Sequence, residues 1–165
     1  MLGTDGGIFA FGDCPFYGSL PALGIQTRVL DMEITPTGQG YWILGEDGGI
    51  FSFGDAQFQG SLPALGIVPW KPLKKIKSTA TGRGYYLIGE DGGIYAFGDA
   101  VYQGSLPAIS VWKTAVDMEI TPSGNGYYIL TSDGAIYPFG YAPDRGDILD
   151  YNIVTTLLDM DVNVK

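Results

Sequence analysis

Carboxylates recur at equivalent positions of a repeated segment, and they are the side chains of this chain best suited to hold a metal ion. Asp31, Asp117 and Asp159 share one position of the repeat, which Lys75 fills in the remaining copy. A second charged position lies two residues further on, at Glu33, Lys77, Glu119 and Asp161. Oxygen-rich clusters suit Ca²⁺, so a channel site at Asp31, Asp117 and Asp159 is one interpretation. We favour the other, in which the lysines are counter-ions; no further cofactor is expected.

Two tryptophan–lysine pairs lie in the loops between repeats, at Trp70-Lys71 and Trp112-Lys113. Tryptophan beside lysine in a surface loop can stack on the face of a sugar or anchor a protein partner. The alternative is that both indoles pack over the edge of a sheet. These four residues are the candidate ligand-binding or partner-binding residues.

Composition excludes several kinds of chemistry. The chain has no histidine and one cysteine, so imidazole-dependent catalysis, histidine metal sites and an internal disulfide are impossible. A net charge of −9 disfavours nucleic-acid binding. No apolar stretch is long enough to insert into a membrane, and the first residues show no signal peptide.

A strong internal repeat must position these residues. Asp-Gly turns begin at Asp5, Asp47, Asp91 and Asp133, with spacings of 42, 44 and 42 residues. Each unit is expected to form four short strands, which in the first complete copy are residues 29–35, 41–45, 50–53 and 57–62. Asp-Gly between apolar runs predicts a tight hairpin because glycine supplies the positive φ that such turns need. No segment shows the periodicity of a helix.

Four strands in about 42 residues is the size of one blade of a β-propeller. We therefore expect one all-β domain, residues 1–165, with four blades. Three blades are continuous, at about 29–64, 73–108 and 115–149. The fourth is composite: residues 158–165 join residues 1–22, which closes the ring and hides the strand edges. A monomer is favoured, and an eight-bladed dimer of half-rings is the alternative.

The segment from Gly40 to Ser61, Gly-Tyr-Trp-Ile-Leu-Gly-Glu-Asp-Gly-Gly-Ile-Phe-Ser-Phe-Gly-Asp-Ala-Gln-Phe-Gln-Gly-Ser, resembles a repeat of actinobacterial surface and secreted proteins. Asp91–Asp99 is more distantly similar to the regulator-of-chromosome-condensation repeat, and the unit is similar in size to kelch repeats. The resemblance implies blade architecture and a cell-surface, extracellular or virion setting. It implies almost nothing about activity, because propellers host many functions.

Every Asp or Glu pair occupies a repeat position with a structural explanation, so we expect that the chain is not an enzyme. The leading hypothesis is a non-catalytic binding or scaffolding propeller that acts through a protein partner, for example as a structural component of an extracellular or virion assembly. The first alternative is a lectin-like module that binds a glycan through Trp70 and Trp112. The second is a small hydrolase, because paired carboxylates can cleave glycosides without histidine.

Overall fold

Three antiparallel sheets of the same design follow one another along the chain. A computed structural model describes residues 1–151, 153 and 155–162. The first sheet contains β1 (Val29–Ile34), β2 (Gly40–Gly45) and β3 (Ile50–Gly54). The second contains β4 (Leu73–Ser78), β5 (Gly84–Gly89) and β6 (Ile94–Gly98). The third contains β7 (Ala115–Ile120), β8 (Gly126–Thr131) and β9 (Ile136–Gly140). The 3₁₀ turns η1 (Pro21–Leu23), η2 (Pro63–Leu65), η3 (Pro107–Ile109) and η4 (Ile148–Tyr151) follow the successive repeats.

The predicted Asp-Gly hairpin forms between β2 and β3. Asp47 Oδ1 accepts a hydrogen bond of 2.8 Å from Gly49 N, and Gly48 has a φ of +83°. A Cβ at Gly48 would lie 2.8 Å from Leu62 Cδ1, so the position excludes side chains by conformation and by space. The turn therefore fixes the register of the hairpin and seats Leu62, which is fully buried.

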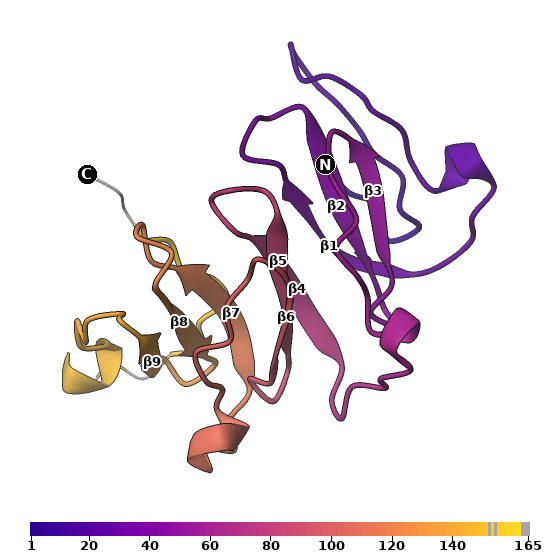
Figure 1. Cartoon of the computed structure of the whole chain (residues 1–165). Helices are drawn as coiled ribbons and strands as arrows, with labels where there is room; N and C mark the ends of the chain where they lie inside the picture. The colour runs from indigo at the N-terminus through magenta and orange to yellow at the C-terminus, as the bar shows by residue number, and fades with distance from the viewer. Residues whose placement is uncertain (152, 154, 163–165) are drawn as a thin grey trace.

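The sheets lie side by side like blades, with their first strands adjacent (Figure 1). β1 packs beside β4, and β4 packs beside β7. Apolar faces of neighbouring sheets meet in two cores, one containing Trp42 with Tyr85 and the other containing Tyr86 with Tyr127. A third core joins the N-terminal segment, through Leu20, to the first sheet. Stacked sheets with buried faces confirm the all-β prediction and give the arrangement of propeller blades.

The expected fourth strand of each unit does not pair in a sheet, and this corrects the prediction of four-stranded blades. Residues 57–62 carry no strand, and three of their backbone groups bond to aromatic side chains instead of to a neighbouring strand. Trp42 Nε1 donates to Gln57 O at 2.9 Å. Tyr85 of the next sheet accepts from Gln59 N at 3.1 Å and donates to Gly60 O at 2.5 Å. The aromatic hydroxyls thus replace the ladder that a fourth strand would make.

The composite fourth blade is not confirmed. Leu157 N donates to Ser132 O at 3.2 Å, as Ala115 N donates to Glu90 O at 2.8 Å one sheet earlier. The described C-terminal residues therefore lie beside the third sheet, where the first strand of a following blade would begin. The N-terminal segment lies beside the first sheet, at the other end of the molecule (Figure 1), and its one bridge among the described residues joins Leu2 and Ile8. Residues 163–165 of the expected closing strand lie outside the described part of the chain.

Candidate functional site

Two exposed tryptophans meet on one rim of the molecule. Trp70 and Trp112 are 68% and 66% exposed, and their ring centroids are 5.7 Å apart at an interplanar angle of 82°. This is the edge-to-face arrangement that aromatic pairs prefer. Trp70 and Trp112 hold each other in place and remain exposed. Together they form a preorganised apolar contact surface, which we call the tryptophan surface.

The repeat explains why the two indoles meet. Trp70 lies three residues before β4, and Trp112 lies three residues before β7. Because β4 and β7 are neighbours, the same offset places both rings at one junction between sheets. The sequence identified Trp70 and Trp112 separately but missed their contact, although this common offset was the signal that could have predicted it.

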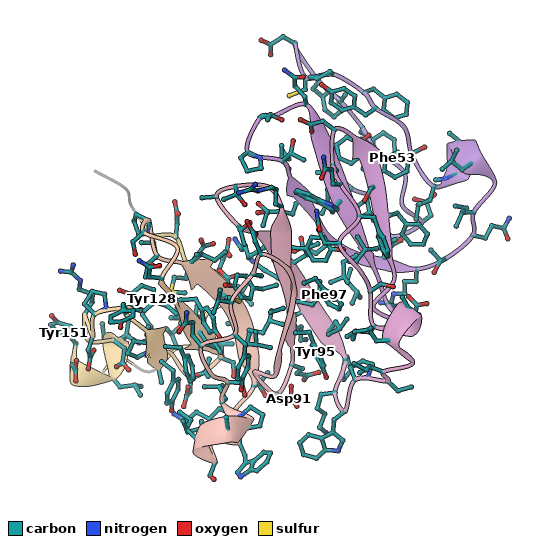
Figure 2. The ribbon with its side chains drawn as sticks, in the orientation of Figure 1. Phe53, Asp91, Tyr95, Phe97, Tyr128 and Tyr151 are labelled. Carbon is teal, nitrogen blue, oxygen red and sulfur yellow. The ribbon has the colours of Figure 1, made fainter. Side chains whose placement is uncertain are left out.

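A groove of about 300 Å³ runs beneath the tryptophan surface. Its lining consists of the two Trp-Lys pairs, an adjacent proline and threonine, and two acidic residues of the β5–β6 turn: Trp70, Lys71, Pro72, Glu90, Asp91, Trp112, Lys113 and Thr114. Glu90 N donates to Pro72 O at 2.7 Å, which ties the turn to the loop before β4. Asp91 lies at this edge of the second sheet near Tyr95 (Figure 2). Glu90 and Asp91 were not predicted as site residues.

The two lysines of the site are already engaged. Lys71 Nζ lies 5.5 Å from the centroid of the Trp70 ring, a cation–π distance. Lys113 Nζ lies 2.8 Å from Asp133 Oδ2 and 5.5 Å from the Tyr137 ring. The hydrogen bond from Lys113 lowers the pKa of Asp133 to about 2, and the same bond raises the pKa of Lys113. All four predicted binding residues therefore line one groove, with Lys113 held toward Asp133.

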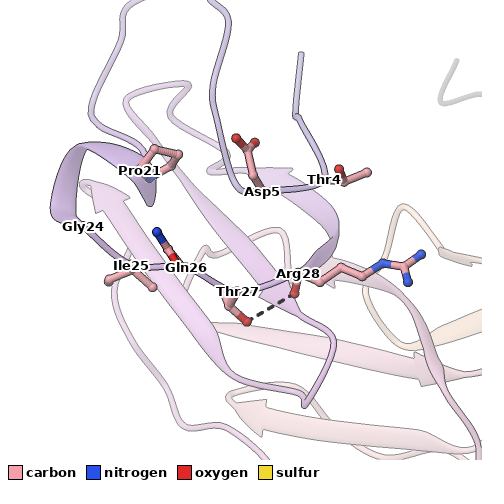
Figure 3. A pocket seen from close by; sticks show the side chains of 8 residues that line it. All are labelled: Thr4, Asp5, Pro21, Gly24, Ile25, Gln26, Thr27 and Arg28. Carbon is pink, nitrogen blue, oxygen red and sulfur yellow. Dashed lines mark hydrogen bonds between the residues drawn. The ribbon is translucent and has the colours of Figure 1, made fainter.

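The equivalent junction before β1 lacks the aromatic pair. Its groove has a volume of about 660 Å³ and is lined by Thr4, Asp5, Pro21, Gly24, Ile25, Gln26, Thr27 and Arg28 (Figure 3). Gln26 occupies the offset that tryptophan has in the next two units. The tryptophan surface is thus a feature of one junction, and the repeat itself does not require it.

The carboxylates of the inner strands connect neighbouring blades. A register shift in β1 and in β7 comes directly before Asp31 and Asp117 and aims each toward the next blade. Asp31 Oδ2 accepts from Ile76 N at 3.0 Å, and Asp117 Oδ2 accepts from Met160 N at 2.8 Å. Each carboxylate therefore accepts a hydrogen bond from a backbone amide of the following unit, in β4 for Asp31 and in the C-terminal segment for Asp117.

Lys75 lies between the remaining carboxylates. Its Nζ is 2.9 Å from Asp117 Oδ1 and 2.7 Å from Asp159 Oδ1. In the second charged row, Lys77 pairs with Glu119, and Glu33 accepts from Ser78 N at 3.0 Å. Among the described residues, no three carboxylate, histidine or cysteine side chains gather as a metal-ligand group. The structure thus places lysines as counter-ions in both rows, and a Ca²⁺ site at Asp31, Asp117 and Asp159 stays an untested prediction.

Burial dominates the titration of these acids. Desolvation raises the pKa of Asp31, Glu33, Asp117 and Glu119, although backbone or lysine partners oppose the rise. Burial alone would lower the pKa of Lys75, but the carboxylates of Asp159 and Asp117 raise it above its ordinary value. Ionisation of these buried carboxylates is therefore opposed by desolvation and favoured by their hydrogen-bond and lysine partners.

The fold and site define an all-β protein of blade-like sheets with an aromatic contact surface. No family model and no curated protein matches the sequence, so the proposed repeat family has no support from sequence comparison. Solved structures similar to the chain include the β-propeller domain of Cps50 (Swd1) from Myceliophteria thermophila, at 10% identity and a TM-score of 0.48. The matched region covers 73% of this chain and 41% of that chain.

Two further similar structures are named 6-phosphogluconolactonase. The one from Bacteroides uniformis has 16% identity and a TM-score of 0.43, with 73% of this chain and 39% of that chain covered. The one from Bacteroides fragilis has 19% identity and a TM-score of 0.45, with 70% and 38% covered. The chain therefore spans about two fifths of the length of these proteins.

These names correct one expectation. We expected that the chain is not an enzyme, and two similar structures that bear the name of an enzyme contradict this, so the expectation is withdrawn. The identities are too low to carry any activity from those proteins to this chain. Within the described part of the chain, no helix is long and apolar enough to cross a membrane.

Proposed function

We propose that this chain is a propeller-type binding module that contacts a protein partner through the tryptophan surface. The observation that carries the proposal is the edge-to-face pair of Trp70 and Trp112, both about two-thirds exposed. Tryptophan is enriched among the residues that dominate binding energy at protein interfaces. A pair already ordered by mutual contact loses little side-chain entropy when a partner covers it.

The chemistry of the groove favours a protein over a glycan. Lys71 lies over the Trp70 ring, and the two indoles meet edge to face, so their broad faces are partly occupied. The corner between them suits an aliphatic side chain, while Glu90 and Asp91 beside it suit a basic residue of the partner. The cell-surface, extracellular or virion setting implied by the repeat resemblance belongs to this proposal.

A glycan is the second candidate, favoured by the same two carboxylates. Glu90 and Asp91 are part of the groove lining, and carboxylates accept hydrogen bonds from sugar hydroxyls beside an aromatic platform. Both candidate functions use Trp112, and they differ in the ligand that the chain binds, a protein or a glycan.

The test compares the wild type with Trp70→Ala and Trp112→Ala, with Val68→Ala as a matched control in the same loop. Val68 is also exposed but does not line the groove. We expect a protein partner, identified by cross-linking and then purified, to bind the wild type and the control at least tenfold more tightly than either tryptophan variant. Binding of a glycan array with the same dependence would support the second candidate instead. Partner binding that both tryptophan variants preserve would overturn the proposal.

A further inference from the structure

One aromatic position of the repeat differs sharply in exposure along the molecule. Phe53, Phe97 and Phe139 are the next-to-last residues of the third strands of their sheets and are 7–8% exposed. Figure 2 shows Phe53 and Phe97 in successive sheets. Phe11 has the same place in the N-terminal unit, yet it is 65% exposed. Something that covers the other three rings is missing at Phe11.

Part of the missing cover is a tyrosine of the adjacent second strand, which lies 5.5–5.7 Å from each of the three buried rings. The other part is a glycine of the preceding unit. A Cβ on this glycine would lie 2.6–2.8 Å from the ring Cδ1 it faces, so only glycine lets the backbone lie against the ring. These pairs are Gly18 on Phe53, Gly60 on Phe97 and Gly104 on Phe139. Each glycine has a φ between +127° and +133°, which also disfavours a side chain. One interface is thus built three times inside the chain.

The residue beside the phenylalanine repeats the same contrast. A Cβ on Gly54 would lie 2.9 Å from Tyr17 Cγ, and one on Gly140 would lie 2.9 Å from Gln103 Oε1, both of the preceding unit, although in each case the nearest atom is a carbonyl oxygen of the same unit. At Gly98 all three nearest atoms belong to its own unit. At Gly12, the equivalent position after Phe11, no atom of the described residues outside its chain neighbours comes within 4 Å. Phe11 and Gly12 therefore form an uncovered half of the interface, which we call the N-terminal face.

The other half lies at the opposite end of the molecule, where none of the described residues covers it with an aromatic ring. Gly146 follows Gly140 by six residues, as Gly60 follows Gly54, and it is exposed; its φ is +75°, against +127° to +133° at the three covered junctions. Its nearest contact is Asp150 instead of an aromatic ring. Exposed Tyr141 and Tyr151 flank this segment, and Figure 2 shows Tyr151 far from Phe53. Residues 141–151 form the C-terminal face.

We propose that the N-terminal face of one copy packs against the C-terminal face of a second copy, with Phe11 seated on Gly146 of its neighbour. The three internal junctions indicate this partner. In each of them the phenylalanine equivalent to Phe11 is covered by the glycine equivalent to Gly146. Because the two faces differ, the contact is head to tail, and a closed pair joins both ends of each chain. Eight units in such a ring is within the size of known propellers.

Mass measured by light scattering over a range of concentrations is the first test. The wild type is expected to have twice the monomer mass, and Phe11→Asp is expected to halve it. Phe58→Asp is the matched control, because Phe58 is 55% exposed and belongs to neither end face, and this variant is expected to leave the mass unchanged. Circular dichroism of each variant checks that it is folded. A monomeric wild type, or a dimer that Phe11→Asp preserves, would overturn the proposal.

A cross-link distinguishes two copies from closure of one chain on itself. In a Cys14→Ser background, Phe11→Cys and Gly146→Cys are prepared as separate chains, mixed and oxidised. We expect a covalent dimer from the mixture and little from either chain alone. If only a single chain carrying both cysteines cross-links, without a doubled mass, then the ring closes within one chain and the proposal is wrong.

Discussion

The hydroxyl of Tyr85 donates a hydrogen bond of 2.5 Å to the carbonyl oxygen of Gly60 and so ties the second sheet to the segment that follows the first. The same hydroxyl accepts from Gln59 N. Tyr41 and Tyr127 make the equivalent bonds to Gly18 and Gly104, each at 2.5 Å. This type of contact recurs at three junctions between successive units and substitutes there for a fourth strand.

Removal of the Tyr85 hydroxyl should therefore destabilise the chain. Tyr85→Phe leaves a part-buried carbonyl and amide of the neighbouring segment without a partner, which costs about 1–3 kcal/mol. Urea unfolding measures the change. Tyr151→Phe is the control, because Tyr151 is 77% exposed and its loss should stay within about 0.5 kcal/mol. Equal effects of the two variants would mean that the hydroxyl bond contributes nothing specific.

Lys75 is expected to be more important for stability than an ordinary surface lysine. Its ammonium pairs with the fully buried Asp117, so Lys75→Met leaves a buried carboxylate without its counter-ion and should cost about 3–5 kcal/mol. Asp117→Asn in the same chain should recover part of that loss, because it removes the unpaired charge and keeps an oxygen for Met160 N. A double-mutant cycle by chemical denaturation gives the coupling, and a value near zero would rule out the pairing.

Calcium separates the two interpretations of the inner-strand carboxylates. With Lys75 between Asp117 and Asp159, added Ca²⁺ should leave the melting temperature of the wild type unchanged. Lys75→Gln frees both carboxylates, so the variant should gain a Ca²⁺-dependent rise in melting temperature. Differential scanning calorimetry with and without Ca²⁺ measures both melting temperatures. A rise already present in the wild type, and lost in Asp117→Asn, would establish the channel site instead.

Mild acid should stabilise the fold. Burial raises the pKa of Asp31, Glu33, Asp117 and Glu119 above their values in the unfolded chain, so the folded state binds protons more tightly. That contribution is complete below about pH 4 and is lost as pH rises through the raised pKa values. The free energy of unfolding should therefore increase from pH 7 toward pH 4.

Stronger acid should reverse the trend. The pKa of Asp133 is lowered to about 2 by the Lys113 bond, so the stability from this pair disappears as pH falls below about 4. Unfolding measured across this range should show a maximum. Glu33→Gln is expected to flatten the upper limb, and a steady decline from pH 7 downward would contradict the assignment.

A buried and an exposed tryptophan should differ in the stability that their removal costs. Trp42 is fully buried, so Trp42→Ala should destabilise by about 3–5 kcal/mol. Trp112→Ala loses mainly the aromatic contact with Trp70, about 0.5–1.5 kcal/mol. Chemical denaturation measures both. If Trp112→Ala proved as costly as Trp42→Ala, its role would be structural packing, and the binding proposal would lose its basis.

Sequence alone predicted the strands that carry strong local signals. The Asp-Gly hairpins and the aromatic runs of β2, β5 and β8 lie where periodicity and turn chemistry place them. It did not predict that residues 57–62 leave the sheet, because that outcome depends on tyrosine hydroxyls of a different unit. The contact between Trp70 and Trp112 was missed for the same reason: it exists only once neighbouring blades are adjacent.

The recurring backbone bond between successive units, from Ala115 N to Glu90 O and from Leu157 N to Ser132 O, has a consequence for cooperativity. Each sheet is stabilised only by the units next to it, as in a one-dimensional array. The second sheet is packed between two other three-stranded sheets and should show the slowest amide hydrogen exchange. Protection should then decrease outward in both directions along the chain, so that local opening begins at the ends of the row.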